Sequence, residues 1–307
     1  MTGEIQRIAI VGAGAMGGMY ASHFAPAGFD IDLIARGERA ERLRAGLTVN
    51  GTPLVASVID VDSDRPVQPA DLVIFAVKDR HLGQAIEDAA AVVGPETIIL
   101  SILNGLDSED RIAARYGTAR VLLCVALGMD AERDGNEIRF RQAGRLVFGR
   151  ADNGPEPDPL VAKVQRALDR AGLDWQTPPD MRHVIWSKFF FNVGINQASA
   201  LLHAPYGAFQ DDGDARQLMK ALMSEVLLVA EAEGVALGEE DIANWDRVLA
   251  NMPAAGWTSM AQDANSGRET EVETFAGRVV ALGERHGIGV PYNQALLWAL
   301  RASHPRG

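Results

Sequence analysis

The stretch "RIAIVGAGAMGG", residues 7–18, decides the fold. A short apolar run of strand length leads into a glycine-rich segment that opens a helix-like pattern. The glycines match the spacing G-x-G-x-x-G, which in this context binds a dinucleotide, although a glycine-rich turn without a ligand is the alternative. The first glycine permits a tight turn, the second lets the backbone approach a pyrophosphate, and the third lets helix and strand pack closely. The residues expected to hold the cofactor are Gly12, Ala13, Gly14, Ala15, Met16 and Gly17.

Four more apolar runs of strand length follow this stretch, with helix-like segments between them. They are apolar on both faces, which is typical of strands in a covered parallel sheet. The alternation of strands and helices predicts an α/β fold, a Rossmann-type doubly wound sheet. The four runs are residues 30–36, 71–77, 97–103 and 121–127.

The end of this half is less regular. Two alternating stretches flank "QAG" in residues 136–150, and we expect an antiparallel hairpin at the end of the sheet. An amphipathic helix over 160–172 and a final strand over 173–177 should follow.

After "TPPD", residues 177–180, the chain shows helical patterns alone. We therefore expect two domains, a Rossmann-type NADP-binding domain over 1–178 and an all-helical substrate and catalytic domain over 179–307. The expected helical stretches are 180–203, 213–234, 239–252, 257–286 and 291–302.

Composition narrows the classes of function. The 307 residues carry a net charge of −12, which argues against non-specific binding to nucleic acid or an anionic membrane. No apolar run is long enough for a membrane span. Cys124 is the one cysteine, so no disulfide can form within the chain, and we read it as a buried small hydrophobe. A cytoplasmic protein is expected, and we predict no metal site.

The end of the second predicted strand indicates the cofactor. NAD-binding chains commonly carry an acid there for the ribose 2′-hydroxyl, whereas this chain carries Arg36. A guanidinium can pair with a 2′-phosphate, with Arg39 assisting, so we predict NADPH; the alternative is a solvated surface arginine. Lys78 and Asn104 follow two other strands, at the edge of the sheet where ligands bind.

The stretch "IWSKFFFNVGINQASALL", residues 185–202, carries Lys188, Asn192 and Asn196 four residues apart. In a helix these side chains share one stripe. The stripe is either a buried polar tie to neighbouring helices or a substrate-binding face.

A second polar cluster lies in residues 256–273. Thr258, Ser259, Asp263 and Glu271 are expected in one helical or near-helical stretch. Exposed acids are commonly only solvated, and Ser259 could instead cap the helix or bond locally.

From residue 7 to about residue 294, the chain resembles the ketopantoate reductases (2-dehydropantoate 2-reductases). The motifs are "GAGAMG", "ARG", "VK", "LNG", "RDGN", "WSK…N…N" and "TSM.QD…GR.TE". The resemblance implies NADPH-dependent reduction of ketopantoate to pantoate, a step of pantothenate and coenzyme A biosynthesis. It implies that Lys188 donates a proton to the ketone oxygen and that Glu271 lies near lysine, cofactor and substrate. It assigns substrate contacts to Asn192, Asn196 and Ser259, and cofactor contacts to Gly12 to Gly17, Arg36, Lys78, Asn104 and Ala131.

Two positions depart from the family. Tyr206 and Gly256 stand where the family commonly has substrate-contacting asparagines, so recognition of the distal part of the substrate should differ. A different 2-oxo acid, an opine-type or 3-hydroxy acid-type dehydrogenase, and a catalytically idle NADP-binding sensor are the alternatives. The helical domain fits a monomer and a homodimer equally.

Overall fold

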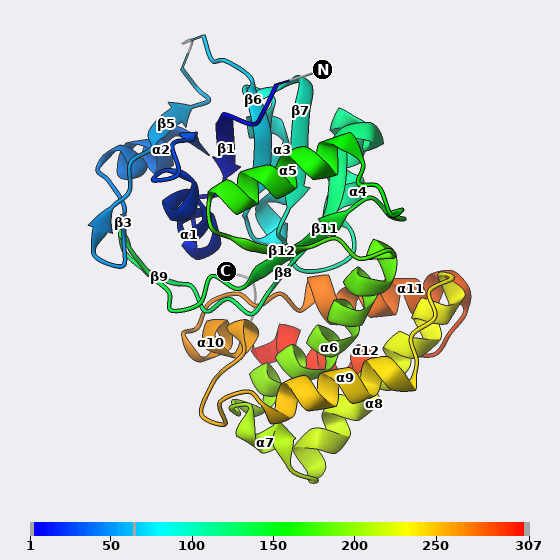
Figure 1. Ribbon diagram of the computed structural model, residues 1–307. Coiled ribbons are helices and arrows are strands. Elements are labelled where there is room, and N and C mark those ends of the chain that lie inside the picture. The colour runs from blue at the N-terminus through cyan, green and yellow to red at the C-terminus, as the bar shows by residue number, and fades with distance from the viewer. Residues whose placement is uncertain (1–2, 64–65, 304–307) are drawn as a thin grey trace. The chain divides into compact units, whose positions relative to one another are not determined.

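A computed structural model describes residues 3–63 and 66–303, which divide into two compact units after Met181 (Figure 1). The first unit contains the strands and the second is helical, which confirms the predicted α/β class with a helical C-terminal part. None of the helices in the described ranges is long and apolar enough to cross a membrane.

The first unit is built on a sheet with the strand order β12-β11-β8-β7-β6-β1-β2-β5. From β5 to β8 neighbouring strands are parallel, and this order is that of a doubly wound dinucleotide-binding sheet. β11 runs antiparallel to β8, and β12 is parallel to β11. The strands are β1 (Arg7–Val11), β2 (Asp30–Ala35), β5 (Ser57–Asp60), β6 (Ala70–Phe75), β7 (Val93–Ser101), β8 (Val121–Leu127), β11 (Arg145–Gly149) and β12 (Asp174–Gln176).

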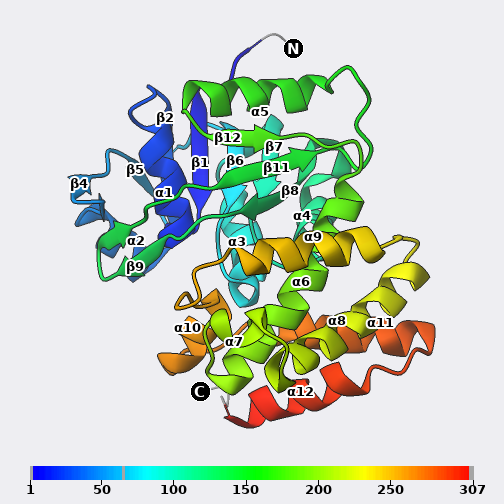
Figure 2. The same cartoon turned by 60° about the horizontal axis from the view of Figure 1, so that its bottom comes forward.

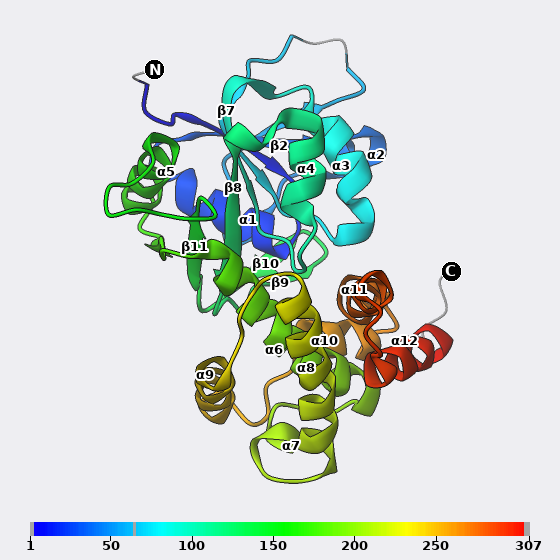
Figure 3. The ribbon, with the colours of Figure 1, turned by 90° about the vertical axis from the view of Figure 1, so that its right-hand side faces the viewer.

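Helices cover both faces of this sheet (Figure 3). Because side chains alternate along a strand, Ile8 and Ile10 of β1 face one core while Ala9 and Val11 face the other. Helices α1 (Ala15–Phe24) and α5 (Pro159–Arg170) supply the first core, and α3 (Leu82–Ala89) and α4 (Ser108–Tyr116) supply the second. The remaining helices are α2 (Gly37–Arg44) and the short turns η1 (Asp79–His81) and η2 (Thr118–Arg120).

The prediction of a hairpin around "QAG" in residues 136–150 is wrong. The actual turn lies earlier, at Gly135 with φ 56°, and joins β9 to β10 in a separate small sheet. The segment around "QAG" is instead fixed by Asp130, whose Oδ1 accepts from the backbone N–H groups of Arg141 and Gln142, both at 2.8 Å. The small sheet has the order β4-β3-β10-β9, with β3 (Thr48–Val49), β4 (Thr52–Pro53), β9 (Glu132–Asp134) and β10 (Glu137–Arg139).

The second unit is organised around α6 (Met181–Leu202), which packs against several other helices (Figure 2). Phe191 of α6 stacks on Trp245 of α9 with ring centroids 4.3 Å apart. The side chain of Gln197 reaches Asn293 of α12 at 3.3 Å. The other helices are α7 (Gly207–Gln210), α8 (Asp214–Ala232), α9 (Glu239–Ala250), α10 (Ser259–Asn265), the π-helical turn η3 (Glu273–Gly277), α11 (Arg278–His286) and α12 (Pro291–Ser303).

The helical stretch expected over 257–286 is interrupted. α10 ends at Asn265, and Gly267 follows with φ 65°, a conformation that favours glycine. The chain resumes a helical path only at η3. The break separates the two halves of the second polar cluster.

Candidate active site

The glycine loop between β1 and α1 has the geometry of a phosphate cradle. Gly12 has φ 107°, and a Cβ there would lie 2.6 Å from the carbonyl oxygen of Ala76. A Cβ on Gly17 would overlap the carbonyl oxygen of Gly12, so helix and strand pack too closely for a side chain. A Cβ on Gly14 would meet nothing within 4 Å, which leaves open space beside the N-terminus of α1. The loop therefore fits a pyrophosphate at the positive end of a helix.

The other cofactor residues predicted from the sequence follow the carboxyl ends of neighbouring parallel strands. Arg36 comes directly after β2, Lys78 lies three residues after β6, and Asn104 lies three residues after β7. Ala131 lies four residues after β8. Because β2, β1, β6, β7 and β8 are parallel neighbours, all these ends share one edge of the sheet with the glycine loop.

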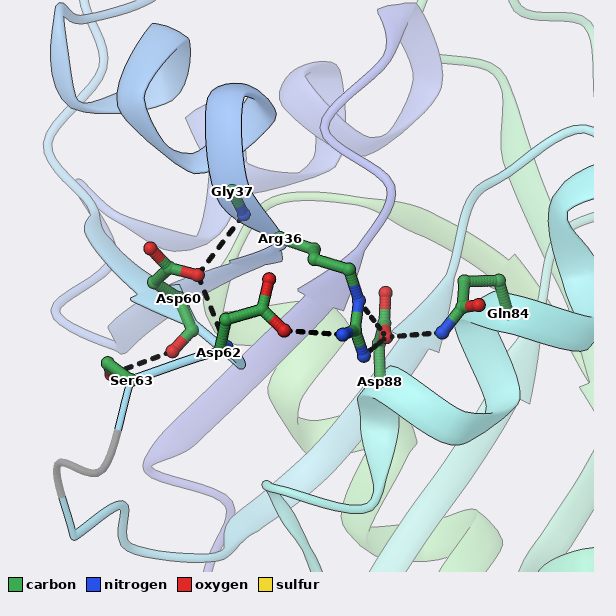
Figure 4. Close-up of polar contacts among 7 residues, drawn as sticks. All are labelled: Arg36, Gly37, Asp60, Asp62, Ser63, Gln84 and Asp88. Carbon is green, nitrogen blue, oxygen red and sulfur yellow. Dashed lines mark hydrogen bonds and ion pairs between the residues drawn. The ribbon is translucent and has the colours of Figure 1, made fainter.

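Arg36 is engaged by two carboxylates (Figure 4). Asp88 of α3 accepts on its Oδ1 from Nε of Arg36 at 3.2 Å and from Nη2 at 2.7 Å. Asp62, in the loop after β5, accepts from Nη1. The hydrogen bond to Asp88, together with the nearby negative charges, raises the pKa of Arg36. The guanidinium is therefore fully charged, and it is held in one place rather than freely solvated.

Arg133 contacts the glycine loop and is near enough to Arg39 and Arg42 for their charges to act on it; these three residues are called the arginine cluster. Arg133 donates from Nη1 to the carbonyl oxygen of Ala13 in that loop and from Nε to that of Gly135 at 2.8 Å. Partial burial, and then the positive charges of Arg39 and Arg42, lower the pKa of Arg133. Arg133 belongs to the "RDGN" motif, from which no role for its side chain was predicted. The cluster provides a positive field where an anion would meet the loop.

A buried carboxyl group lies at the start of α4, against β8. Glu109 of α4 is 7% exposed, its Oε2 lies 2.6 Å from the hydroxyl of Ser108, and its Oε1 accepts from the backbone N–H of Cys124 at 3.3 Å. Burial raises its pKa to about 7. Cys124 is 1% exposed, as predicted for a small buried hydrophobe.

In the second unit, Lys188, Asn192 and Asn196 lie on one stripe of α6, as their spacing predicts. Lys188 and Asn192 are half-buried, and Asn196 is 8% exposed. A polar tie to other helices is made by Gln197, which sequence reasoning missed. Its Nε2 donates to Asn293, and its Oε1 accepts from the backbone N–H of Ala276 in η3 at 2.9 Å.

The second polar cluster does not form one helix. Thr258, not Ser259, caps α10, since its Oγ1 accepts from the N–H of Ala261 at 3.1 Å. Ser259 is the exposed first residue of α10. Asp263 has a structural contact, accepting from Nε of Arg268 at 2.8 Å. Glu271 lies beyond the break, half-buried, just before η3.

The two departures from the family pattern contact each other. A Cβ on Gly256 would lie 3.0 Å from Cδ2 and 3.2 Å from Cε2 of the Tyr206 ring. The backbone N–H of Tyr206 also donates to the carbonyl oxygen of Gly256 at 2.9 Å. A methyl group at position 256 would therefore press tightly against this ring and against the carbonyl oxygen of Pro253, so the small residue at 256 and the ring at 206 form a matched pair.

Comparisons with known proteins show which family of proteins this chain matches. Residues 8–153 match the family described as ketopantoate reductase PanE/ApbA, and residues 180–304 match its C-terminal domain. A 2-dehydropantoate 2-reductase of Archaeoglobus fulgidus is 29% identical over 299 residues, 97% of this chain and 98% of the relative.

Two solved structures share the fold along the whole chain. A PanE/ApbA family ketopantoate reductase from Ralstonia eutropha JMP134 is 29% identical with a TM-score of 0.83, covering 97% of this chain and 98% of the other. D-mandelate dehydrogenase, solved with NADH and anilino(oxo)acetate, has a TM-score of 0.87 at 21% identity, with 97% and 98% covered.

Proposed function

This chain belongs to the ketopantoate reductase family and is an oxidoreductase, and we propose that it uses NADPH to reduce ketopantoate to pantoate. The observation that carries the proposal is the stripe of Lys188, Asn192 and Asn196 on α6, in a chain that matches both domains of the family. The remaining proposed substrate and catalytic residues are Ser259 and Glu271.

The chemistry of these side chains suits reduction of a ketone. The bound nicotinamide supplies the hydride. Negative charge then develops on the ketone oxygen, where the Nζ ammonium of Lys188 stabilises it and donates a proton. The amides of Asn192 and Asn196 orient the substrate, the hydroxyl of Ser259 binds its carboxylate, and Glu271 helps to hold the ammonium group of Lys188 in place.

Lys188→Ala tests this role. We expect kcat to fall by about 10²- to 10⁴-fold, as for loss of a general acid, while the Kd for NADPH stays near the wild-type value. Lys220→Ala is the matched control, because Lys220 is an exposed lysine on α8 of the same unit. Near-normal turnover of Lys188→Ala would remove the lysine from the mechanism.

The choice of NADPH is supported by charge around the glycine loop. Arg36, Arg39 and Arg42 follow β2, and Arg133, which follows β8, donates to the carbonyl oxygen of Ala13 in the glycine loop. The proposed further contacts are Lys78, Asn104 and Ala131. The ratio of kcat/KM for NADPH to that for NADH, in wild type and in Arg36→Ala, tests the assignment. A preference of the wild type for NADH would overturn it.

A second candidate substrate is a 2-oxo acid with a larger apolar part. The pairing of Tyr206 with Gly256 favours it, because an aromatic ring and a residue without a side chain stand where the family commonly has amide groups. A panel of 2-oxo acids at fixed NADPH concentration decides between the two. The highest kcat/KM for ketopantoate supports the first candidate, and the highest for an aromatic 2-oxo acid supports the second.

A further inference from the structure

The donors of Arg36 are already partly occupied. A guanidinium has five N–H groups, and phosphate is bound best by two parallel ones. Asp88 takes Nε and one N–H of Nη2, which together form one forked edge. Asp62 takes one N–H of Nη1. A 2′-phosphate must therefore use the donors that remain or displace a carboxylate.

The two carboxylates are not equivalent (Figure 4). The Asp88 side chain is 13% exposed and also accepts from Nε2 of Gln84 at 2.9 Å, so three N–H donors fix its Oδ1. The Asp62 side chain is 46% exposed and contacts Arg36 through Nη1. Asp88 therefore anchors the guanidinium, whereas Asp62 is free to move into solvent.

Charge also distinguishes the two cofactors at this position. Two carboxylates around one guanidinium leave a net negative charge, which opposes a phosphate dianion. A ribose 2′-hydroxyl is neutral and can donate to a carboxylate, as in NAD-binding proteins. Asp62 thus offers the group that suits NADH beside the arginine that suits NADPH.

We propose that Asp62 is a cofactor-specificity residue that lowers the affinity for NADPH relative to the affinity for NADH. With NADH, its carboxylate stays on Arg36 and accepts the ribose hydroxyl. With NADPH, it gives up Nη1 to the 2′-phosphate. This inference rests on the proposed binding of the 2′-phosphate by Arg36.

Binding of cofactor fragments tests the proposal without turnover. Isothermal titration calorimetry on the full chain compares adenosine 2′,5′-bisphosphate, which carries the 2′-phosphate, with adenosine 5′-monophosphate, which lacks it. In Asp62→Asn we expect the bisphosphate to bind on the order of tenfold more tightly, since a like charge is removed from its site. The monophosphate should bind as in wild type, because asparagine retains an oxygen acceptor. The gain should shrink with added salt.

Asp30→Asn is the matched control. Asp30 begins β2, the strand that ends just before Arg36, and it pairs with Arg7. Asp30→Asn removes the same negative charge as Asp62→Asn but leaves the contacts of the Arg36 guanidinium unchanged. An equal gain in Asp30→Asn would overturn the proposal in favour of a general charge effect. If the bisphosphate binds Asp62→Asn as it binds wild type but binds Arg36→Ala more weakly, the role of Asp62 is refuted and the role of Arg36 stands. Unchanged affinity in Arg36→Ala would remove the proposed role of Arg36, and this inference with it.

Discussion

The buried carboxyl group of Glu109 makes the stability of the first unit depend on pH. Burial raises its pKa from 4.5 to about 7, so the folded protein favours the neutral form. The stabilising proton is fully bound below the unfolded pKa and is lost as the pH rises through about 7. The difference between the two pKa values corresponds to about 3 kcal/mol of unfolding free energy, because each pKa unit is worth about 1.4 kcal/mol.

Glu109→Gln removes this dependence. The amide is neutral at every pH, and its oxygen can still accept from the N–H of Cys124. Relative to wild type, we expect the variant to gain about 2 to 3 kcal/mol of unfolding free energy between about pH 5 and about pH 8. Urea unfolding followed by circular dichroism at the two pH values measures this change.

Glu96→Gln is the control for net charge, because Glu96 is an exposed residue of β7. If Glu109→Gln shows the same change as Glu96→Gln between the two pH values, the carboxyl group is not held neutral and the reasoning fails. A constant offset at both pH values would equally refute it, since it would report packing rather than titration.

Three further variants test packing and polar contacts. Glu225→Ala should lower the unfolding free energy by about 3 kcal/mol, because this buried carboxylate accepts from two backbone N–H groups at the start of α12; a loss below about 1 kcal/mol in urea unfolding would contradict this. Gly17→Ala should lower the unfolding free energy by about 1 to 3 kcal/mol and weaken cofactor binding, since its Cβ would overlap the carbonyl oxygen of Gly12; unchanged thermal unfolding would contradict this and show that the loop can widen. Gly256→Ala should destabilise the wild type by more than it destabilises a Tyr206→Ala background, in which the close contact with the carbonyl oxygen of Pro253 remains, and additive losses in this double-mutant cycle would refute the pairing.

Much of the first unit could be predicted because its signals are local. Apolar runs of strand length and a glycine loop between strand and helix define a doubly wound sheet without knowledge of distant contacts. The "QAG" segment was mispredicted for the opposite reason. Asp130 fixes that segment by accepting hydrogen bonds from Arg141 and Gln142, which lie 11 and 12 positions further along the chain. No pattern within the segment predicts these contacts.

In the candidate site, too, local features were predicted from the sequence and contacts between distant residues were not. The position of Arg36 at the end of β2 followed from the sequence, but its partners lie 26 and 52 residues away and were found only in the structure. The four-residue spacing on α6 correctly predicted one stripe. It could not reveal that Gln197, one residue outside the stripe, makes the polar tie to η3 and α12.

In the glycine loop, the requirement for close internal packing and the requirement for space beside a ligand fall on different glycines. Substitutions at Gly12 and Gly17 are opposed by the protein's own packing, whether or not a cofactor is bound. At Gly14 the surroundings of an added methyl group are open, and an alanine would disturb only what approaches from outside. Glycine at this position is thus explained by the approach of a ligand and not by the packing of the loop. A Gly14→Ala chain would serve as a folded reference protein in which cofactor binding alone is impaired.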